Sequence, residues 1–378
     1  MQTLSVPQGE FCLQRYPVRK NETLRAWDAA DEYLLSQVAE EDGLTSQSRI
    51  LIINDQFGAL AVALNSYHCT SSTDSWLATR ATQHNLSKNS LSTDDLTQLD
   101  SLATPQGPFD LVLIKIPKSL AMLEDQLTRL RPLLSEDTRV IGAAMAKAIH
   151  TSTLKLCEKI IGPTTTSLAK KKARLIFPTL DSSLQPAEDK YPSAYTLENT
   201  DYTIWNHAGV FSRDSLDIGT RFFLQHLPEA LHPQQIIDLG CGNGVVGLIA
   251  AAKNPEAEVT FVDESYMAVA SAQKNFEAAF GDSRKARYIA TDCLKGIPQG
   301  CADLVLNNPP FHQQNVVGDF IALQMFRESL KVLKKGGELW VIGNRHLGYH
   351  SQLKKIFGNC ELVASNRKFV ILKAVKSR

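Results

Sequence analysis

A short proline-containing motif in the last third of the chain has the residue types needed to hold an amino group. It reads Asn308-Pro309-Pro310-Phe311 and follows an apolar run. Two prolines fix the backbone and remove two N–H donors, so the local carbonyl oxygens are available as acceptors. If the Asn308 side-chain oxygen and the Pro309 carbonyl oxygen each accept one amine hydrogen, the nitrogen is held with its lone pair toward an electrophile. Catalytic roles are therefore predicted for Asn308 and Pro309, and for Phe311 as a face that stacks on a planar substrate.

A glycine-rich loop upstream distinguishes this motif from an ordinary proline-stiffened turn after a strand. The loop reads Asp238-Leu239-Gly240-Cys241-Gly242-Asn243-Gly244 and separates an apolar segment from a helix-forming one. Glycines let a backbone turn tightly and approach a ligand without Cβ collisions. Within it, Gly242-Asn243-Gly244-Val245-Val246-Gly247 matches the dinucleotide fingerprint, with the acidic Asp263 about 20 residues further on. A nicotinamide-dependent oxidoreductase is therefore one interpretation.

Asp238 favours a different cofactor. In dinucleotide-binding folds the first fingerprint glycine follows closely on the strand, and the helix N-terminus receives a diphosphate. Here a carboxylate stands at the strand end, where it would repel a diphosphate and attract a cationic group. S-adenosylmethionine has a sulfonium, an ammonium and no phosphate, so it is the predicted cofactor. Asp263 suits ribose hydroxyls in either case. No metal is expected, because no ligand spacing in the sequence indicates one.

The elements that must position these residues alternate between strand and helix. The predicted strands are 236–239, 259–263, 303–306 and 338–343, with a closing antiparallel pair at 361–364 and 369–375. The predicted helices are 245–252, 267–280 and 319–333, the last of them ended by Lys334-Lys335-Gly336-Gly337. This alternation predicts an α/β fold in which helices cover both faces of a parallel sheet.

The N-terminal half repeats the pattern and lacks the chemistry. Residues 50–55 and 111–115 are predicted strands, and the spacing from Thr73-Asp74-Ser75-Trp76 to Gln83-His84-Asn85 nearly matches that from Val262-Asp263-Glu264-Ser265-Tyr266 to Gln273-Lys274-Asn275. Asn54-Asp55-Gln56-Phe57-Gly58 stands in place of the glycine loop, and Lys115-Ile116-Pro117-Lys118 in place of the Asn-Pro-Pro-Phe motif. We interpret the N-terminal half as a diverged copy of the same fold, with chance similarity between two α/β domains as the alternative.

Two domains are expected from the length of 378 residues. Residues 181–192 lack periodicity and contain two prolines, which is typical of a linker. The predicted domains are residues 1–185, the degenerate copy, and residues 195–378, the catalytic domain.

Composition narrows the class of protein. The 40 basic residues balance the 40 acidic ones, so net charge does not indicate a nucleic-acid partner. The first ten residues do not resemble a signal peptide, and the apolar runs are too short to span a membrane. Seven cysteines are scattered without a C-x-x-C pair. We therefore expect a cytoplasmic protein with reduced thiols.

Taken together, the Asp238 loop, Asp263, Thr291-Asp292-Cys293 and the Asn308 motif resemble class I methyltransferases that act on amino nitrogens. The segment 209–221 and the inactive-looking N-terminal copy extend the resemblance to bacterial ribosomal RNA guanine-N2 methyltransferases, over essentially the whole chain. The segments 27–34, 150–154 and 344–347 are more similar to the large-subunit enzymes than to their small-subunit relatives. The resemblance implies two tandem class I (Rossmann-like) methyltransferase domains and N2-methylation of one guanosine of 23S rRNA, numbered 1835 in the usual bacterial scheme.

The resemblance also assigns roles to individual residues. It implies that Asp238, Gly240 and Gly242 line the methionine end of the cofactor, and that Asp263 binds the ribose. Asp292 would meet the adenine amine and Asn308 the target nitrogen. The full set expected at the cofactor is Phe211, Ser212, Thr220, Asp238, Gly240, Cys241, Gly242, Gly244, Asp263, Asp292 and Asn308. The N-terminal copy is expected to recognise the RNA.

Several alternatives stay open at the level of sequence. A 16S rRNA guanine-N2 methyltransferase is the nearest one. An adenine-N6 or protein glutamine-N5 methyltransferase would also place a planar amino group against an Asn-Pro-Pro-aromatic turn. From other classes, the alternatives are an NAD-dependent oxidoreductase and a non-catalytic RNA-binding protein.

Overall fold

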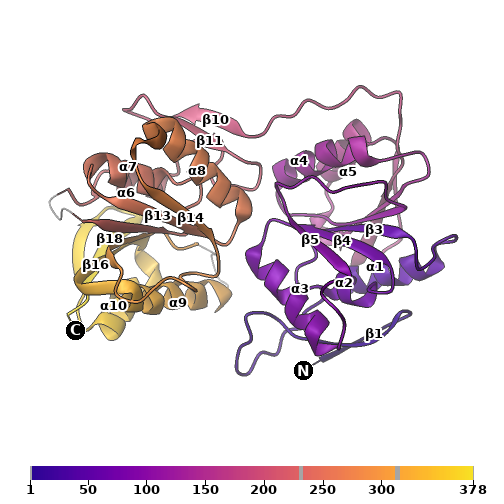
Figure 1. The fold of residues 1–378 in the computed structure, drawn as a ribbon, viewed down its shortest axis with the longest axis horizontal. Coiled ribbons are helices and arrows are strands. Elements are labelled where there is room, and N and C mark those ends of the chain that lie inside the picture. Colours follow the sequence, from indigo (N-terminus) through magenta and orange to yellow (C-terminus); the bar gives the residue numbers. More distant parts are fainter. Residues whose placement is uncertain (1, 230–232, 311–315, 378) are drawn as a thin grey trace. The chain divides into compact units, whose positions relative to one another are not determined.

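Two seven-stranded sheets, one in each half of the chain, form the framework of the fold (Figure 1). The computed structural model describes residues 2–229, 233–310 and 316–377. The chain divides into two compact units, Met1–Tyr191 and Pro192–Arg378. Each unit contains one of the two sheets.

The first unit begins with a hairpin and continues as an alternating α/β domain. Its strands are β1 (Gln2–Val6), β2 (Gly9–Leu13), β3 (Arg49–Ile53), β4 (His68–Thr73), β5 (Leu96–Asp100), β6 (Leu111–Lys115), β7 (Arg139–Met145), β8 (Thr164–Thr166) and β9 (Ala173–Pro178). Its α-helices are α1 (Ala29–Glu40), α2 (Ala59–Ala63), α3 (Trp76–Lys88), α4 (Leu120–Leu130) and α5 (Thr151–Ile160).

The second unit has the same arrangement after a different hairpin. Its strands are β10 (Ser193–Thr196), β11 (Thr203–Asn206), β12 (Gln235–Leu239), β13 (Glu258–Asp263), β14 (Ala286–Ala290), β15 (Ala302–Asn307), β16 (Leu333–Asn344), β17 (Glu361–Ser365) and β18 (Phe369–Val375). Its α-helices are α6 (Ile218–Leu224), α7 (Val245–Lys253), α8 (Tyr266–Phe280), α9 (Val316–Val332) and α10 (Tyr349–Phe357).

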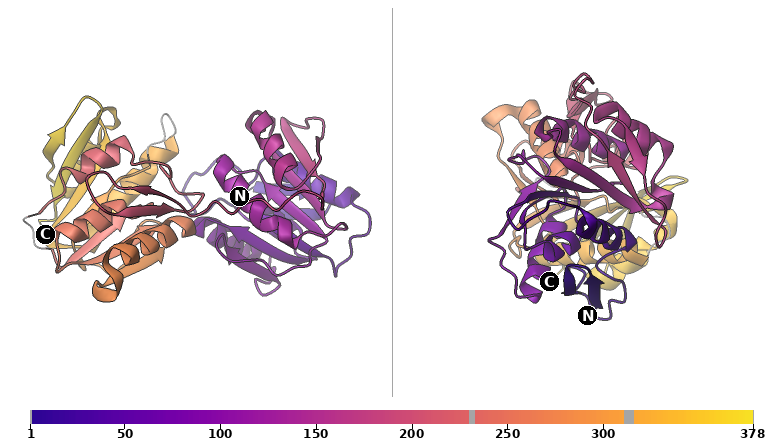
Figure 2. Two further views of the ribbon diagram at one scale, coloured as in Figure 1. Left: turned by 90° about the horizontal axis from the view of Figure 1, so that it is seen from above. Right: turned by 90° about the vertical axis from the view of Figure 1, so that its right-hand side faces the viewer.

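The two sheets have the same strand order. The first runs β5-β4-β3-β6-β7-β9-β8 and the second runs β14-β13-β12-β15-β16-β18-β17. Neighbouring strands are parallel except that β9 and β18 run antiparallel to both of their neighbours. Parallel neighbours require crossover helices, and these pack on the two faces of each sheet (Figure 2). The predicted fold of two tandem Rossmann-like domains is confirmed.

Alternating side chains of the central strands supply the cores on the two sheet faces. In the second unit, Ile236 of β12 packs into the core under α6, α7 and α8, whereas Ile237 and Leu239 belong to the core under α9 and α10. In the first unit, Ile50 and Ile52 of β3 lie in one core, and Leu51 between them lies in the other. The period of two explains why each central strand reads as a continuous apolar run when both of its faces are buried.

The end of the longest helix differs from the sequence prediction. Residues 334–337 were expected to separate helix from strand, but β16 already begins at Leu333, which pairs with Ala302 of β15. Gly336 has a φ of 82° and its N–H donates to the Lys376 carbonyl at 2.7 Å. The glycine turn is therefore hydrogen-bonded into the sheet and forms part of the strand region.

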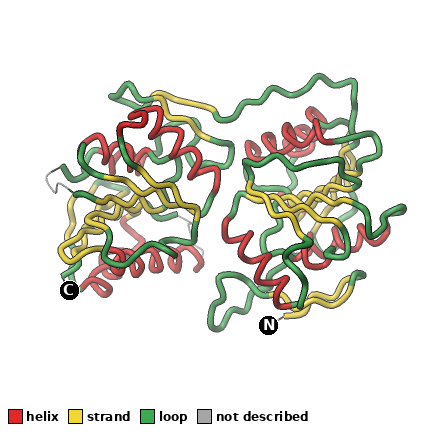
Figure 3. Tube along the Cα trace, viewed as in Figure 1, coloured by secondary structure: helices red, strands yellow, loops and turns green. Residues whose placement is uncertain are grey.

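The segment 181–192 contains no helix or strand (Figure 3). Strand β10 begins directly after it, at Ser193. Arg131 donates to the carbonyl oxygens of Asp181, Leu184 and Gln185 at 3.0, 2.6 and 3.0 Å. Lys190 forms an ion pair of 2.6 Å with Glu124 of α4. These contacts attach most of the segment to the first unit.

None of the helices in the described ranges is long and apolar enough to cross a membrane. The seven cysteines are all free thiols.

Candidate active site

The predicted site residues of the second unit gather at the carboxyl edge of its sheet. The chain leaves β12 for β13 on one side and later places β15 on the other side of β12. Such a reversal of strand order opens a crevice beyond the strand ends, where α/β sheets bind ligands. The loop after β12, the last residue of β13 and the first residue after β15 all meet there.

The glycine loop after β12 is held in a conformation that excludes side chains. Gly240, Gly242 and Gly244 have φ values of 70°, 54° and 79°. At Gly244 a Cβ atom would lie 2.9 Å from the Cα of Ala272, so this glycine is needed for packing against α8. At Gly242 a Cβ would meet no atom within 4 Å. The loop therefore packs on the protein at one glycine and faces open space at another.

Two carboxyl groups belong to the ends of β12 and β13, one of them buried and the other partly exposed. Asp238 is 3% exposed, and its Oδ2 accepts the Gly247 N–H at 2.7 Å. Asp263 accepts the N–H groups of Gly242 and Ser265 at 2.9 and 3.0 Å. Burial, together with the charge of Asp263, raises the pKa of Asp238 to about 8. Burial also raises the pKa of Asp263, against the opposing effect of its backbone hydrogen bonds.

Cys241 lies within the same loop as a packed thiol. It is 6% exposed, and burial beside the two carboxyl groups raises its pKa well above the ordinary value. Its backbone N–H and that of Gly240 both donate to the Val262 carbonyl, at 3.0 and 2.8 Å. Cys241 thus fastens the loop to β13, and its side chain stays neutral.

The Asn308 amide is oriented by a chain of hydrogen bonds from α6. Its Nδ2 donates to the Thr220 hydroxyl at 3.1 Å. The Thr220 hydroxyl in turn lies 3.3 Å from the Asp217 Oδ2, which also accepts the Thr220 N–H at 2.9 Å. With its amide nitrogen engaged, Asn308 presents a buried Oδ1 that has no hydrogen-bond partner among the residues that the structure describes. An acceptor in this state fits an N–H group of a bound substrate.

Two residues of this arrangement were missed by the sequence analysis. Asp217 is the N-cap of α6, and the spacing Asp217-x-x-Thr220 is a helix-start signal that the sequence does contain. Asn307 is fully buried, and its Nδ2 donates to the Leu239 carbonyl at 2.9 Å, which ties β15 to β12. No local signal reveals the role of Asn307, because its partner lies far away in the sequence.

The remaining predicted residues differ in how closely they approach this cluster. Asp292 follows β14, and its Oδ1 accepts an N–H of Gln324 from α9 at 3.2 Å. Its neighbour Thr291 donates its N–H to the Asp263 carbonyl at 2.9 Å, so Asp292 stands beside the end of β13. Phe211 is 69% exposed and Ser212 has a φ of 51°, in the loop before α6. Among the described residues, no hydrogen bond joins Phe211 or Ser212 to Asp238, Asp263 or Asn308.

Pro309 is buried directly after Asn308, as the turn requires. Phe311 lies outside the described residues, so its predicted stacking role is not tested. Among the residues that the structure describes, no three His, Cys, Asp or Glu side chains gather as a metal site would need.

The arrangement fits S-adenosylmethionine. The carboxyl groups of Asp238 and Asp263 form no ion pair within the described part of the chain. They attract a positively charged ligand and raise the electrostatic cost of a diphosphate. The open space at Gly242 and the unpaired Asn308 oxygen lie on the same sheet edge. The site can therefore bind a cationic nucleoside and hold an amine next to it.

Comparisons with known proteins match both halves of the chain. Residues 1–182 match the family described as RLMG N-terminal domain, and residues 201–373 match the family described as Methyltransferase small domain. Two curated relatives bear the name ribosomal RNA large subunit methyltransferase G. The Streptomyces avermitilis protein is 49% identical, over 99% of each chain, and the Ectopseudomonas mendocina protein is 50% identical, over 100% of each chain.

A solved structure shares the fold of the whole chain. The T. thermophilus 16S rRNA N2 G1207 methyltransferase, in complex with AdoMet and guanosine, aligns with a TM-score of 0.77. It is 21% identical and the alignment covers 99% of this chain and 97% of that one. The tandem arrangement of two α/β domains is therefore common to both proteins.

Proposed function

The chain belongs to the ribosomal RNA large subunit methyltransferase G family, and from this premise we infer that it transfers a methyl group from S-adenosylmethionine to ribosomal RNA. In finer detail, we propose that the acceptor is N2 of one guanosine in 23S rRNA, at position 1835, and that the protein acts in the cytoplasm. The single observation that carries the chemistry is the buried Oδ1 of Asn308, which has no hydrogen-bond partner within the described ranges.

The cofactor would be held by the loop after β12 and by the ends of β13 and β14. Asp238 and Asp263 supply negative charge for the cationic end and acceptors for the ribose hydroxyls. Gly242 leaves the space that the ligand needs, since a Cβ there would meet no protein atom. When bound, S-adenosylmethionine supplies an electrophilic methyl group on a sulfonium.

Asn308 would hold the target nitrogen. The N2 amine of guanine is a weak nucleophile because its lone pair is delocalised into the ring. By accepting one N–H of that amine, Asn308 Oδ1 fixes the nitrogen in place and stabilises the positive charge that develops on it. The Pro309 carbonyl is the proposed second acceptor. The proton released from the methylated nitrogen passes to water, so no strong general base is needed in the chain.

Thr220 is the positioning residue for Asn308 in this proposal. A half-turn of the Asn308 side-chain amide would exchange the positions of its oxygen and its nitrogen. The hydrogen bond from Asn308 Nδ2 to the Thr220 hydroxyl selects the rotamer that directs the oxygen at the substrate.

The proposal is tested by kinetics on rRNA with three variants, alongside calorimetry for cofactor affinity. Asn308→Ala should lower kcat by roughly 100-fold, as for loss of one catalytic hydrogen-bond group. Thr220→Val should lower it by about tenfold, the scale of one neutral hydrogen bond, and Thr220→Ser, which keeps the hydroxyl, should be near the wild type.

Cofactor affinity should change little in Asn308→Ala. An unchanged kcat in this variant, or a collapse of cofactor affinity with kcat intact at saturation, would contradict the role given to its side-chain oxygen.

A further inference from the structure

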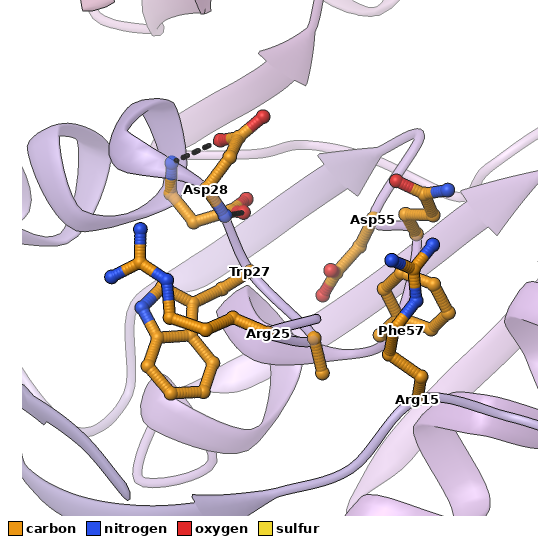
Figure 4. Close-up of a pocket in the computed structure, with 9 residues that line it drawn as sticks. Arg15, Arg25, Trp27, Asp28, Asp55 and Phe57 are labelled. Carbon is orange, nitrogen blue, oxygen red and sulfur yellow. Dashed lines mark hydrogen bonds between the residues drawn. The ribbon is translucent and has the colours of Figure 1, made fainter. Parts of the chain in front are cut away.

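The first unit contains a cavity of about 170 Å³ at the carboxyl edge of its own sheet, where the second unit has the candidate active site (Figure 4). Its lining comes from the loop between β2 and α1, the start of α1 and the loop after β3. The residues are Arg15, Arg25, Ala26, Trp27, Asp28, Asp31, Asp55, Gln56 and Phe57.

This cavity is not a second copy of the cofactor site. Both sheets pair their central strands in the same register, so their residues can be matched one by one. The equivalent positions are Ile52 for Asp238, Thr73 for Asp263 and Lys115 for Asn308. At the first two of these positions the carboxyl groups are replaced by an alkyl group and a hydroxyl. A carboxyl group is kept in the loop after β3, where Asp55 accepts the N–H of Ala61 as Asp238 accepts that of Gly247 in the second unit.

Lys115 occupies the position that corresponds to Asn308, the proposed acceptor of the amine hydrogen. Its Nζ lies 2.8 Å from Asp28 and 2.7 Å from Asp31, at the start of α1. These contacts correspond to the bond between Asn308 and Thr220 at the start of α6 in the second unit. An ion pair fills the catalytic position in the first unit and leaves the neighbouring cavity available for a different ligand.

Two stacked cation–aromatic pairs form opposite sides of the cavity. The Arg15 guanidinium lies 4.9 Å from the centre of the Phe57 ring, and the Arg25 guanidinium lies 5.4 Å from that of Trp27. Figure 4 shows each arginine beside its ring, with the Asp55 carboxyl between the two pairs. Arginine planes and aromatic rings are the groups on which proteins stack unpaired bases, and arginine also binds phosphate.

The loop that supplies part of the lining is basic in sequence, although the lining itself contains three aspartates and Arg25 lies 3.4 Å from Glu32 in an ion pair. The loop of residues 14–28 carries Arg15, Arg19, Lys20 and Arg25, against Glu22 and Asp28. This local excess of positive charge occurs in a chain whose total basic and acidic counts are equal. A phosphodiester backbone that passes over this loop would gain counterion-release energy from these side chains.

Asp55 supplies acceptors inside the cavity. It is 2% exposed, and its two oxygens accept the N–H groups of Gly58 and Ala61 at 3.1 and 2.9 Å. Burial and the charge of Asp31 raise the pKa of Asp55 to about 7. In its ionised form the carboxylate has about four acceptor positions, so about two remain for a ligand. The Watson–Crick edge of guanine carries two adjacent donors, N1–H and the N2 amine, which one carboxylate can bind together.

We propose that this cavity binds one unpaired guanine nucleotide of the RNA substrate, with the base between the two cation–aromatic pairs and its donor edge at Asp55. The phosphates lie against Arg15 and Arg25. The inference rests on the proposed RNA substrate, and it gives the N-terminal unit a defined part in RNA recognition.

Calorimetry of the full-length protein with GMP and with UMP tests this site without any methyl transfer. GMP should bind and UMP should bind at least tenfold more weakly, because uracil lacks the amino group. Asp55→Asn and the double variant Arg15→Gln/Arg25→Gln should each weaken GMP binding by tenfold or more. Arg80→Gln is the matched control, because Arg80 also stacks on an aromatic ring, that of Trp76, on a helix outside the cavity.

The active-site variant Asn308→Ala separates the two candidate guanine sites. GMP binding that survives in Asn308→Ala and falls in the cavity variants supports the proposal, even if the protein proves to methylate another substrate. The proposal is overturned by GMP binding that is unaffected by Asp55→Asn and by the arginine double variant, by no GMP binding, or by two molecules of S-adenosylmethionine bound per chain.

Discussion

The surroundings of the Asp238 carboxyl lower the stability of the unliganded protein, and they suit the binding of a cationic ligand. Its folded-state pKa of about 8 lies far above the value of about 3.9 for an exposed aspartate. The folded protein therefore retains a proton that the unfolded chain has lost. Stability from this group falls as the pH rises from about 4 to about 8. Such a penalty at a ligand-binding edge is the pattern of a site kept for function.

Asp238→Asn should therefore stabilise the unliganded protein. The amide oxygen can still accept the Gly247 N–H, and the cost of a buried charge is removed. The melting temperature should rise by roughly a few degrees at pH 8, and the gain should shrink toward pH 5. Thermal melts at several pH values measure this effect, and a lower melting temperature at pH 8 would contradict it.

The same substitution should abolish the pH dependence of cofactor binding. A cationic ligand favours the ionised carboxyl, so wild-type affinity should rise by up to about tenfold from pH 6 to pH 7. In Asp238→Asn the affinity should be weak and nearly independent of pH over that range. A wild-type affinity that stays constant between the two pH values would show that Asp238 does not face the cofactor.

At the scale of elements, the loop between β12 and α7 gives its glycines separate tasks. Gly244 begins α7 in the left-handed region and leaves no room for a Cβ against α8. Gly242 is also left-handed, but it faces open space. One glycine serves packing and the other serves ligand access.

Gly244→Ala and Gly242→Ala form a matched pair that tests this division. Both alanines pay the left-handed penalty of about 1 kcal/mol. Gly244→Ala should cost a further 1–3 kcal/mol, roughly, through overpacking, and should lower the melting temperature more. Gly242→Ala should instead weaken S-adenosylmethionine binding. Equal melting temperatures with equal cofactor affinity would contradict the division.

Much of the element scale was predictable from sequence for a physical reason. Strands buried on both faces read as apolar runs, and residues 111–115 were placed with the bounds that β6 has in the structure. The same holds within one or two residues for β12, α7 and α8. Local patterns decide these elements, so local reasoning found them.

The arrangement around Asn308 could not be predicted in the same way. Its bond to Thr220 joins residues 88 positions apart, and nothing in either local pattern specifies the other partner. The ion pair between Lys115 and the start of α1 joins residues 84 and 87 positions apart. The sequence shows Lys115 where the second unit has Asn308, but only the packed structure shows which groups occupy that position.

At the scale of the whole molecule, the two units keep one strand order and differ at one edge. In the second unit that edge carries the carboxyl groups of Asp238 and Asp263 and an amide oxygen with no partner among the described residues. In the first unit it carries an ion pair and a cavity with arginine–aromatic sides. We therefore propose that the fold shared by the two units provides one edge for methyl transfer and one for holding the RNA.

The most direct test of this account is methyl transfer to rRNA isolated from cells that lack the gene. The full-length protein is incubated with that RNA and labelled S-adenosylmethionine, and the modified nucleoside is identified by mass spectrometry and mapped. The account predicts a single N2-methylguanosine in 23S rRNA. Label in 16S rRNA would correct the substrate, whereas label on adenine or on protein, or no transfer at all, would contradict the proposed function.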